Sequence, residues 1–342
     1  MSHETLQITW YILIYVLIIG YAILDGFDLG VGILSPFIAK TDRERRTLLA
    51  AIGPFWDGNE VWLLTAGGAL FAAFPHVYAT LFSGFYLALM LLLLALILRA
   101  VSFEFRSQVE NPAWRRTWDW LFFFGSLLPA FLTGVVMGNV VRGVPLTAEM
   151  EFSGSFFGLL NPLALMFGCG GLVMYILQGA IYLTLKAEGE LAEKARKRAK
   201  KAWIVLIVLV AVIDTFSFIL VPQRYLNFSY APLTIIIPIL LVIFTVLTRT
   251  SMIKDKPKRT FLFSSLTIAS LLGTLAVANF PLLLPASNLA EYGLSIFNAS
   301  ASAKTLTAML IIVLIGMPLV LLYTIYIHRL FRGKVQLDDE GY

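Results

Sequence analysis

Two carboxylates inside an apolar segment constrain this chain more than any other feature. Asp25 and Asp28 lie within residues 23–32, which read Ile-Leu-Asp-Gly-Phe-Asp-Leu-Gly-Val-Gly. A spacing of three residues places both side chains on one face of a helix, and a carboxylate that faced lipid near the bilayer centre would cost several kcal/mol. Both acids must therefore face protein or water, and the fold has to supply a neighbouring helix that buries them.

Composition assigns the chain to the class of all-α polytopic membrane proteins. Hydrophobic residues make up 59% of the 342 residues and charged residues only 14%, whereas charged residues are about 25% of a soluble domain. Nine apolar stretches are each long enough to cross about 30 Å of hydrocarbon at about 1.5 Å per residue. They are residues 8–38, 48–74, 78–98, 118–141, 155–185, 202–221, 231–247, 261–283 and 305–327.

The basic residues predict the orientation of these helices. Of the 26 Lys and Arg residues, 23 lie in alternate connections or in the C-terminal tail, and only Arg142, Arg224 and Lys304 lie on the other side. The positive-inside rule then places the N-terminus outside and the C-terminus in the cytoplasm. The net charge of +5 therefore reports orientation and not nucleic-acid binding.

A depth count predicts which acids meet. The short basic connection at residues 40–46 makes the first two helices an antiparallel hairpin, in which Asp28 matches the depth of Asp57 and Asp25 matches that of Glu60. We expect these four acids to form one polar cluster near mid-membrane that opens toward the cytoplasm. Crowded carboxyls in a low dielectric cannot all ionise, so the cluster could pass protons, with Asp57 as the main handover point. Alternatively, Glu60 is a structural partner of Asp25.

Two further side chains beside these acids have more than one interpretation. Arg99, at the end of the third stretch, is best explained as an interfacial anchor that reaches lipid phosphate, and the alternative is a counter-ion for the acids of the second helix. Trp56 could stack on a quinone ring, although core packing is the simpler explanation.

A weak internal repeat suggests how the helices are grouped. The frame Ile-Leu-x-Gly at residues 23–26 recurs at residues 176–179, with Gln178 in the place of Asp25. Chance similarity between two apolar helices is the alternative. The repeat predicts two four-helix bundles, within residues 1–150 and 151–285, followed by residues 286–342, which contain an outer loop, a peripheral ninth helix and the tail.

The sequence contains few residues that could ligate a metal. Its histidines, His3, His76 and His328, are too far apart in the predicted topology to share a haem, and Cys169 is the only cysteine. We therefore predict no metal site and no haem ligated by this chain. Buried acids remain as the chemistry, and such acids serve proton relays, cation sites or structural pairing.

Two segments resemble a known family. Gly-Phe-Asp-Leu-Gly-Val-Gly at residues 26–32 and Gly-Pro-Phe-Trp-Asp-Gly-Asn-Glu-Val-Trp-Leu at residues 53–63, together with the nine-helix plan, resemble subunit II of the cytochrome bd-type quinol oxidases. The resemblance implies a bacterial cytoplasmic membrane protein that is not catalytic alone. It also implies a partner subunit I that carries haems b and d and the quinol site, a possible small accessory subunit, and reduction of O2 to water by the complex. In that family, the acids of the first two helices are thought to feed protons toward the haems.

Two other classes of function remain open from the residues themselves. A proton- or cation-coupled secondary transporter also buries acids near mid-membrane, but four helices per half would give parallel repeats, and the glycine and proline interruptions are not paired between the halves. A purely structural partner would hold the same acids in ion pairs.

Overall fold

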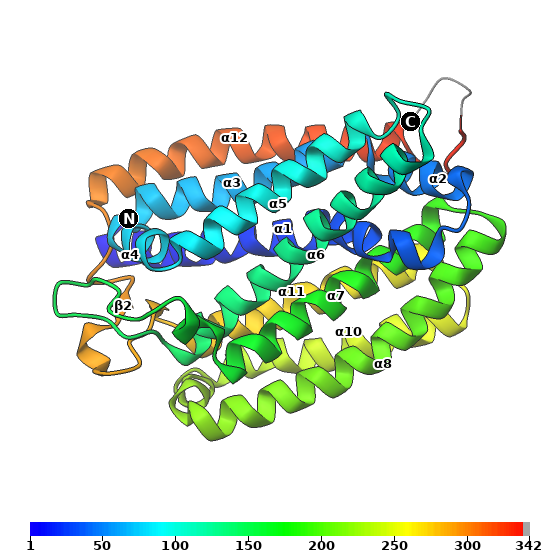
Figure 1. Ribbon diagram of the computed structural model, residues 1–342. Coiled ribbons are helices and arrows are strands. Elements are labelled where there is room, and N and C mark those ends of the chain that lie inside the picture. The colour runs from blue at the N-terminus through cyan, green and yellow to red at the C-terminus, as the bar shows by residue number, and fades with distance from the viewer. Residues whose placement is uncertain (338–342) are drawn as a thin grey trace.

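The computed structural model describes residues 1–337, which form long helices and one short pair of strands (Figure 1). The elements in chain order are α1 (His3–Ile38), α2 (Asp42–Ile52), α3 (Trp56–Ala73), α4 (Pro75–Gly84), α5 (Tyr86–Phe105), α6 (Pro112–Arg142), η1 (Phe157–Leu160), α7 (Pro162–Lys186), α8 (Gly189–Leu220), η2 (Pro222–Tyr225), α9 (Leu226–Tyr230), η3 (Pro232–Ile235), α10 (Ile236–Ile253), α11 (Pro257–Asn279), β1 (Leu282–Leu284), η4 (Ala290–Tyr292), β2 (Leu294–Ser295) and α12 (Ala303–Leu330).

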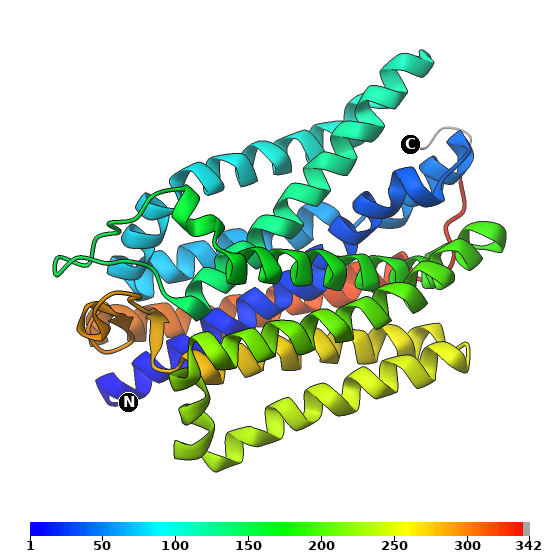
Figure 2. The same cartoon turned by 60° about the horizontal axis from the view of Figure 1, so that its bottom comes forward.

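The first helix, α1, is the centre of the fold. It packs against α3, α6, α7 and α11, and Figure 2 shows α8, α10 and α11 on one side of it and α5 with α6 on the other. Its last turn includes Pro36, which cannot donate to the carbonyl of Gly32. The hydroxyl of Ser35 donates to that carbonyl instead, at 2.8 Å, so the helix continues to Ile38.

The contact between α1 and α7 depends on glycine. A Cβ atom added to Gly179 would lie 2.4 Å from the carbonyl carbon of Gly30, and one added to Gly30 would lie 1.9 Å from the carbonyl oxygen of Tyr175. The two backbones therefore touch directly, as small residues allow in membrane helices. This contact joins the two segments that carry the weak sequence repeat.

Within residues 1–337, eight helices are long and apolar enough to cross a membrane. They are α1, α5, α6, α7, α8, residues Pro232–Ile253, α11 and α12. The predicted stretch 48–74 is not continuous: α2 ends at Ile52, Gly53 and Pro54 form a turn, and α3 begins at Trp56 with 18 residues. The polar first turn of α3 lowers the mean hydropathy of this helix, so α3 is not among the eight. It nevertheless packs alongside α1.

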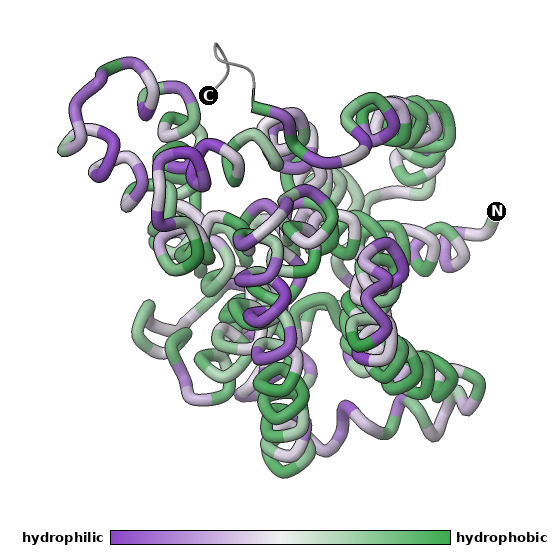
Figure 3. The backbone as a smooth tube through the Cα atoms, turned by 90° about the vertical axis from the view of Figure 1, so that its right-hand side faces the viewer, coloured by the Kyte–Doolittle hydropathy of each residue, from purple (hydrophilic) through white to green (hydrophobic). Residues whose placement is uncertain are grey.

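The other helices differ from the predicted stretches mainly at their ends. For example, α8 begins at Gly189 rather than at residue 202, because no helix breaker separates its basic first turns from its apolar part. Figure 3 shows the helices as largely hydrophobic, with hydrophilic residues on the end of the molecule that faces the viewer, which is the end that holds α2 in Figure 1. This distribution fits helices that lie in lipid.

The end of the molecule near the N-terminus is closed by loops of the same chain. The strands β1 and β2 pair antiparallel, and Leu284 and Leu294 within them are fully buried. The backbone N–H of Ala301 donates to the carbonyl of Ala73 at 2.8 Å. From there α12 runs along the outside of the bundle against α3 and α1 (Figure 1).

Candidate functional site: a buried ion-pair cluster

The acids of α1 meet a cation in the core. Asp25, Asp28 and Arg99 are each fully buried, from α1 and α5. Arg99 Nη2 donates to Asp25 Oδ1 at 2.7 Å and to Glu60 Oε1, from α3, at 2.5 Å. The side chain of Glu60 is 21% exposed. Asp25, Glu60 and Arg99, which we call the Arg99 triad, join α1, α3 and α5 through one guanidinium group.

Asp28 has a different partner. Its Oδ2 accepts a hydrogen bond of 2.7 Å from Asn59 Nδ2, which is also within 3.3 Å of the carbonyl oxygen of Leu24. Asn59 carries no charge that marks it in the sequence, although it directly precedes Glu60. Its amide is the group that satisfies one oxygen of the second buried acid.

Asp57 lies outside this core. It is exposed on the surface of the chain, in the first turn of α3, three residues before Glu60. The matched-depth count therefore agrees with the structure for Asp25 and Glu60, which share Arg99, whereas the hydrogen bond to Asp28 comes from Asn59 and not from Asp57. Depth along a helix does not determine which face of the helix a residue occupies.

The preferred interpretation of Arg99 as an interfacial anchor is wrong. A guanidinium that is fully buried and bonded to two carboxylates cannot reach lipid phosphate. Its position follows from the packing of α5 on α6: a Cβ atom added to Gly125 of α6 would lie 2.7 Å from the carbonyl oxygen of Ala95 and 2.8 Å from the backbone nitrogen of Arg99. The backbone of α5 thus lies directly against α6 at this point, and the side chain of Arg99 reaches Asp25 of α1 and Glu60 of α3.

The ion-pair cluster consists of the Arg99 triad together with Asp28 and Asn59. Several polar atoms in it or next to it have no hydrogen-bond partner among residues 1–337. They are Asp25 Oδ2, Asp28 Oδ1, the Nε and Nη1 atoms of Arg99, and the hydroxyl of Tyr21. Buried polar groups in proteins are nearly always paired with protein or ordered water. The cluster therefore has spare donors and acceptors within the core, which is the chemistry that water-mediated proton transfer needs.

Trp56 packs within the protein. Its ring stacks on Phe103 of α5 with centroids 5.2 Å apart and an interplanar angle of 9°. This contact is what core packing would give. It also ties the start of α3 to the end of α5, next to the Arg99 triad.

A second ion-pair network lies at the end of α1, between α2, α5 and α6. Arg106 donates from Nη2 to Asp42 Oδ1 and from Nε to Asp119 Oδ1, both at 2.7 Å, and Arg45 also pairs with Asp119. Burial tends to raise the pKa of Asp42, but the hydrogen bond and charge of Arg106 outweigh it, so the pKa of Asp42 lies below its ordinary value. This network fixes the hairpin connection that precedes α3.

The residue of α7 that stands in the place of Asp25 in the shared sequence frame is uncharged. Gln178 of α7 is fully buried. Its Nε2 donates to Ser265 Oγ at 3.0 Å, and its Oε1 accepts from Ser264 Oγ at 2.5 Å. Gln178 thus bonds to α11, whereas Asp25 bonds to α5. The position of α7 that matches Asp25 in the sequence frame is thus held by neutral hydrogen bonds and not by an ion pair.

The histidines do not lie together. His3 Nε2 is 3.1 Å from the carbonyl oxygen of Ala301 at the start of α1, His76 is exposed at the start of α4, and His328 contacts Phe55 near the end of α12. No group of three or more His, Cys, Asp or Glu side chains in the described part of the chain could hold a metal ion.

These features define a class: a multi-pass helical membrane protein with acids that are buried and paired with an arginine in its core. Residues 6–331 match the family described as cytochrome bd terminal oxidase subunit II. The chain belongs to this family.

Individual relatives agree with this assignment. The chain is 38% identical to the cytochrome bd-I ubiquinol oxidase subunit 2 of Escherichia coli strain K12, over 99% of this chain and 97% of that protein. It is 37% identical to the cytochrome bd ubiquinol oxidase subunit 2 of Bacillus subtilis strain 168, over 95% and 96%. Among solved structures, the bd oxidase from Geobacillus thermodenitrificans matches with a TM-score of 0.80 at 17% identity, over 96% of this chain and 98% of that one. That likeness supports the fold.

Proposed function

We propose that this chain is subunit II of a bd-type quinol oxidase, which oxidises quinol and reduces O2 to water only together with a haem-bearing subunit I. The family match over residues 6–331 and the names of the relatives support this function. Haems b and d belong to the partner, because the histidines of this chain lie apart. A transporter is not favoured, since the relatives are oxidase subunits.

In this proposal the chain is a scaffold in the bacterial cytoplasmic membrane. α3 is the ninth span, the N-terminus is outside, and the C-terminus is cytoplasmic. Residues 1–150 and 151–285 each form a four-helix bundle, and residues 286–342 add the outer loop, α12 and the tail. The arrangement of α1 and α7 at the centre supports two related halves.

We further propose that the acids carry protons from the cytoplasm toward subunit I. The observation that supports this most directly is that one buried cation, Arg99, faces three carboxyls, those of Asp25, Asp28 and Glu60. Three ionised carboxylates would leave a net charge of −2 in a low dielectric, which is costly. Some of these carboxyls must therefore hold protons, and protons held this way can be exchanged.

The order of the route follows from exposure. Asp57 is at the surface, Glu60 lies one turn further along α3 and is half-buried, and Asp25 and Asp28 are fully buried. Each step moves a proton from a more hydrated carboxyl to a less hydrated one. Asp57 is also in the first turn of α3, where the helix dipole favours a negative charge.

The test compares Asp57→Asn and Asp25→Asn, each in the assembled oxidase, with Glu104→Gln as the control. Glu104 is an exposed carboxyl on α5, outside the cluster. Quinol oxidation, membrane-potential generation and haem content are measured together. We expect either variant to slow turnover while haem content stays normal. Unchanged turnover in both variants would place the route elsewhere, and loss of haem in both would make the cluster an assembly element.

A further inference from the structure

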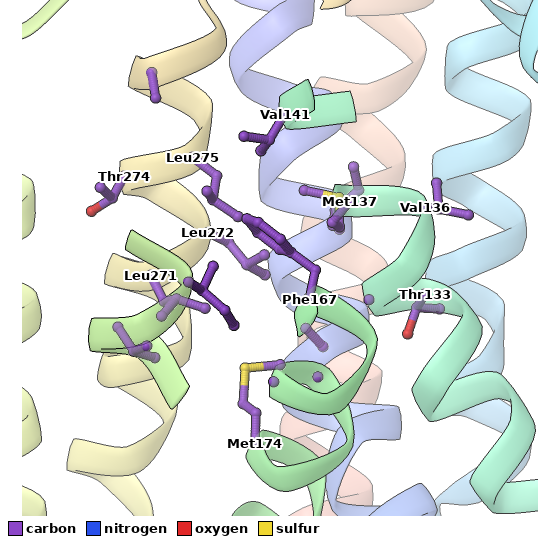
Figure 4. Close-up of a pocket in the computed structure, with 18 of the residues that line it drawn as sticks. Thr133, Val136, Met137, Val141, Phe167, Met174, Leu271, Leu272, Thr274 and Leu275 are labelled. Atoms are coloured by element: carbon purple, nitrogen blue, oxygen red, sulfur yellow. The ribbon is translucent and has the colours of Figure 1, made fainter. Parts of the chain in front are cut away.

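An apolar cavity shares Tyr21 with the surroundings of the ion-pair cluster, but its lining contains none of the charged residues of that cluster. It has a volume of about 330 Å³ and is lined mainly by α6, α7, α8 and α11, within the range of about 300–1,000 Å³ for small-molecule sites. Figure 4 shows Phe167 reaching from α7 toward Leu275 of α11, with Met137 of α6 beside it and Met174 on the next turns of α7. The lining offers only aliphatic, aromatic and thioether surface over most of its length.

One end of the cavity is polar. Arg224 of η2 lines it and is 8% exposed, and its Nε is 3.3 Å from the carbonyl oxygen of Val141. Asp214 of α8 lines the same end, but its Oδ1 accepts a 2.7 Å hydrogen bond from the hydroxyl of Tyr225. Ser217 Oγ, also in the lining, is buried and has no partner among the described residues.

Arg224 differs from the other buried arginines in having no carboxylate. Arg99 and Arg106 are each paired with two acids, whereas none of the ion pairs within residues 1–337 includes Arg224. A guanidinium that is nearly buried needs a counter-charge, and its planar fork of donors matches a phosphate group. The position of Arg224, directly after α8 ends at Leu220, is where a membrane span reaches the head-group region.

We propose that this cavity binds a membrane phospholipid, with the phosphate on Arg224 and one acyl chain between α6, α7, α8 and α11. The charge of Arg224 selects the phosphate, the free hydroxyl of Ser217 supplies a further donor, and the apolar lining accepts the chain. A neutral lipid would fill the cavity but would leave the guanidinium without a counter-charge. The bound lipid would thus form part of the packing between the first and second halves of the chain.

The experiment uses two photoreactive lipids with identical diazirine-bearing acyl chains. One is a phosphatidylglycerol and the other is a diacylglycerol, which lacks the phosphate. Each is added to the purified oxidase complex in maltoside micelles, and the cross-linked peptides are mapped by mass spectrometry. Arg224→Gln removes the phosphate contact. Arg142→Gln is the matched control, because Arg142 is exposed at the end of α6 beside Val141.

We expect phosphatidylglycerol to label the peptides that contain Phe167, Met174 and Leu272. A charge-assisted contact is typically large enough to change binding about tenfold or more, so we expect at least that loss with diacylglycerol or with Arg224→Gln, and none with Arg142→Gln. A second variant, Val210→Trp, fills the cavity and should abolish labelling at these peptides.

Three results would overturn the proposal. These are equal labelling by both lipids, labelling that Arg224→Gln leaves unchanged, and cross-links that lie only on the outer surface of α10 and α12. If Arg224→Gln does not assemble, the comparison of the two lipids on the unmodified complex still decides the outcome.

Discussion

Replacing Arg99 with Met should destabilise the protein more than any substitution of a surface charge. Methionine has a similar length but no charge, so Asp25 and Glu60 would lose their shared donor while remaining in the core. Removing one partner of a buried pair costs about 3–5 kcal/mol. At about 1.4 kcal/mol per factor of ten, the ratio of folded to unfolded protein should fall by roughly two to three and a half orders of magnitude.

A second substitution separates charge from packing. In Arg99→Met combined with Asp25→Asn, one of the two uncompensated acids is gone, so part of the loss should be recovered. Residues in direct contact typically show coupling energies of about 0.5–3 kcal/mol, and we expect a coupling in that range with the sign of a rescue.

The measurement is unfolding of the purified protein in mixed micelles with increasing SDS, followed by tryptophan fluorescence. Arg142→Gln, which removes an exposed arginine, is the control and should change stability by no more than about 0.5 kcal/mol. If Arg99→Met costs no more than this control, or if Asp25→Asn adds its full cost in the double variant, the ion-pair reasoning is wrong.

Two other predictions concern helix packing and pH. Gly179→Ala should lower the free energy of unfolding by about 1–3 kcal/mol, as overpacking usually does, because the new Cβ would lie 2.4 Å from the backbone of α1. Gly58→Ala is the control in the same SDS titration and should be neutral, because a Cβ there meets nothing within 4 Å. The pKa of Asp42 is lowered in the folded protein, so the ionised carboxylate stabilises the fold. This stabilisation is fully present above the pKa of Asp in the unfolded chain, about 3.9, and is lost as the pH falls through the lower pKa of the folded state. The melting temperature should therefore fall more steeply between about pH 6 and about pH 3, a range that brackets this pKa, in the unmodified protein than in Asp42→Asn. Parallel curves for the two proteins would contradict this assignment.

The sequence alone was sufficient to assign the membrane class and to place most of the helices. Long apolar runs leave few other solutions in lipid, since backbone groups must be paired within the segment, and eight helices have the length and hydropathy of spans. The sequence could not predict that Gly53 and Pro54 separate α2 from α3, or that α8 continues through its basic first turns, because helix ends depend on local turns and tertiary contacts as well as on hydropathy.

The sequence also determined that Asp25 and Asp28 had to be buried, because lipid cannot solvate a carboxylate. Only the tertiary structure decided what buries them. Arg99 is 74 residues from Asp25 in the chain, and its backbone lies against Gly125 of α6, so the pair forms only when α1, α5 and α6 have packed together. Residue counting gives the height of a side chain in a helix hairpin but not its direction around the helix. That direction, set by packing, brings Glu60 and Asn59 inward and leaves Asp57 at the surface.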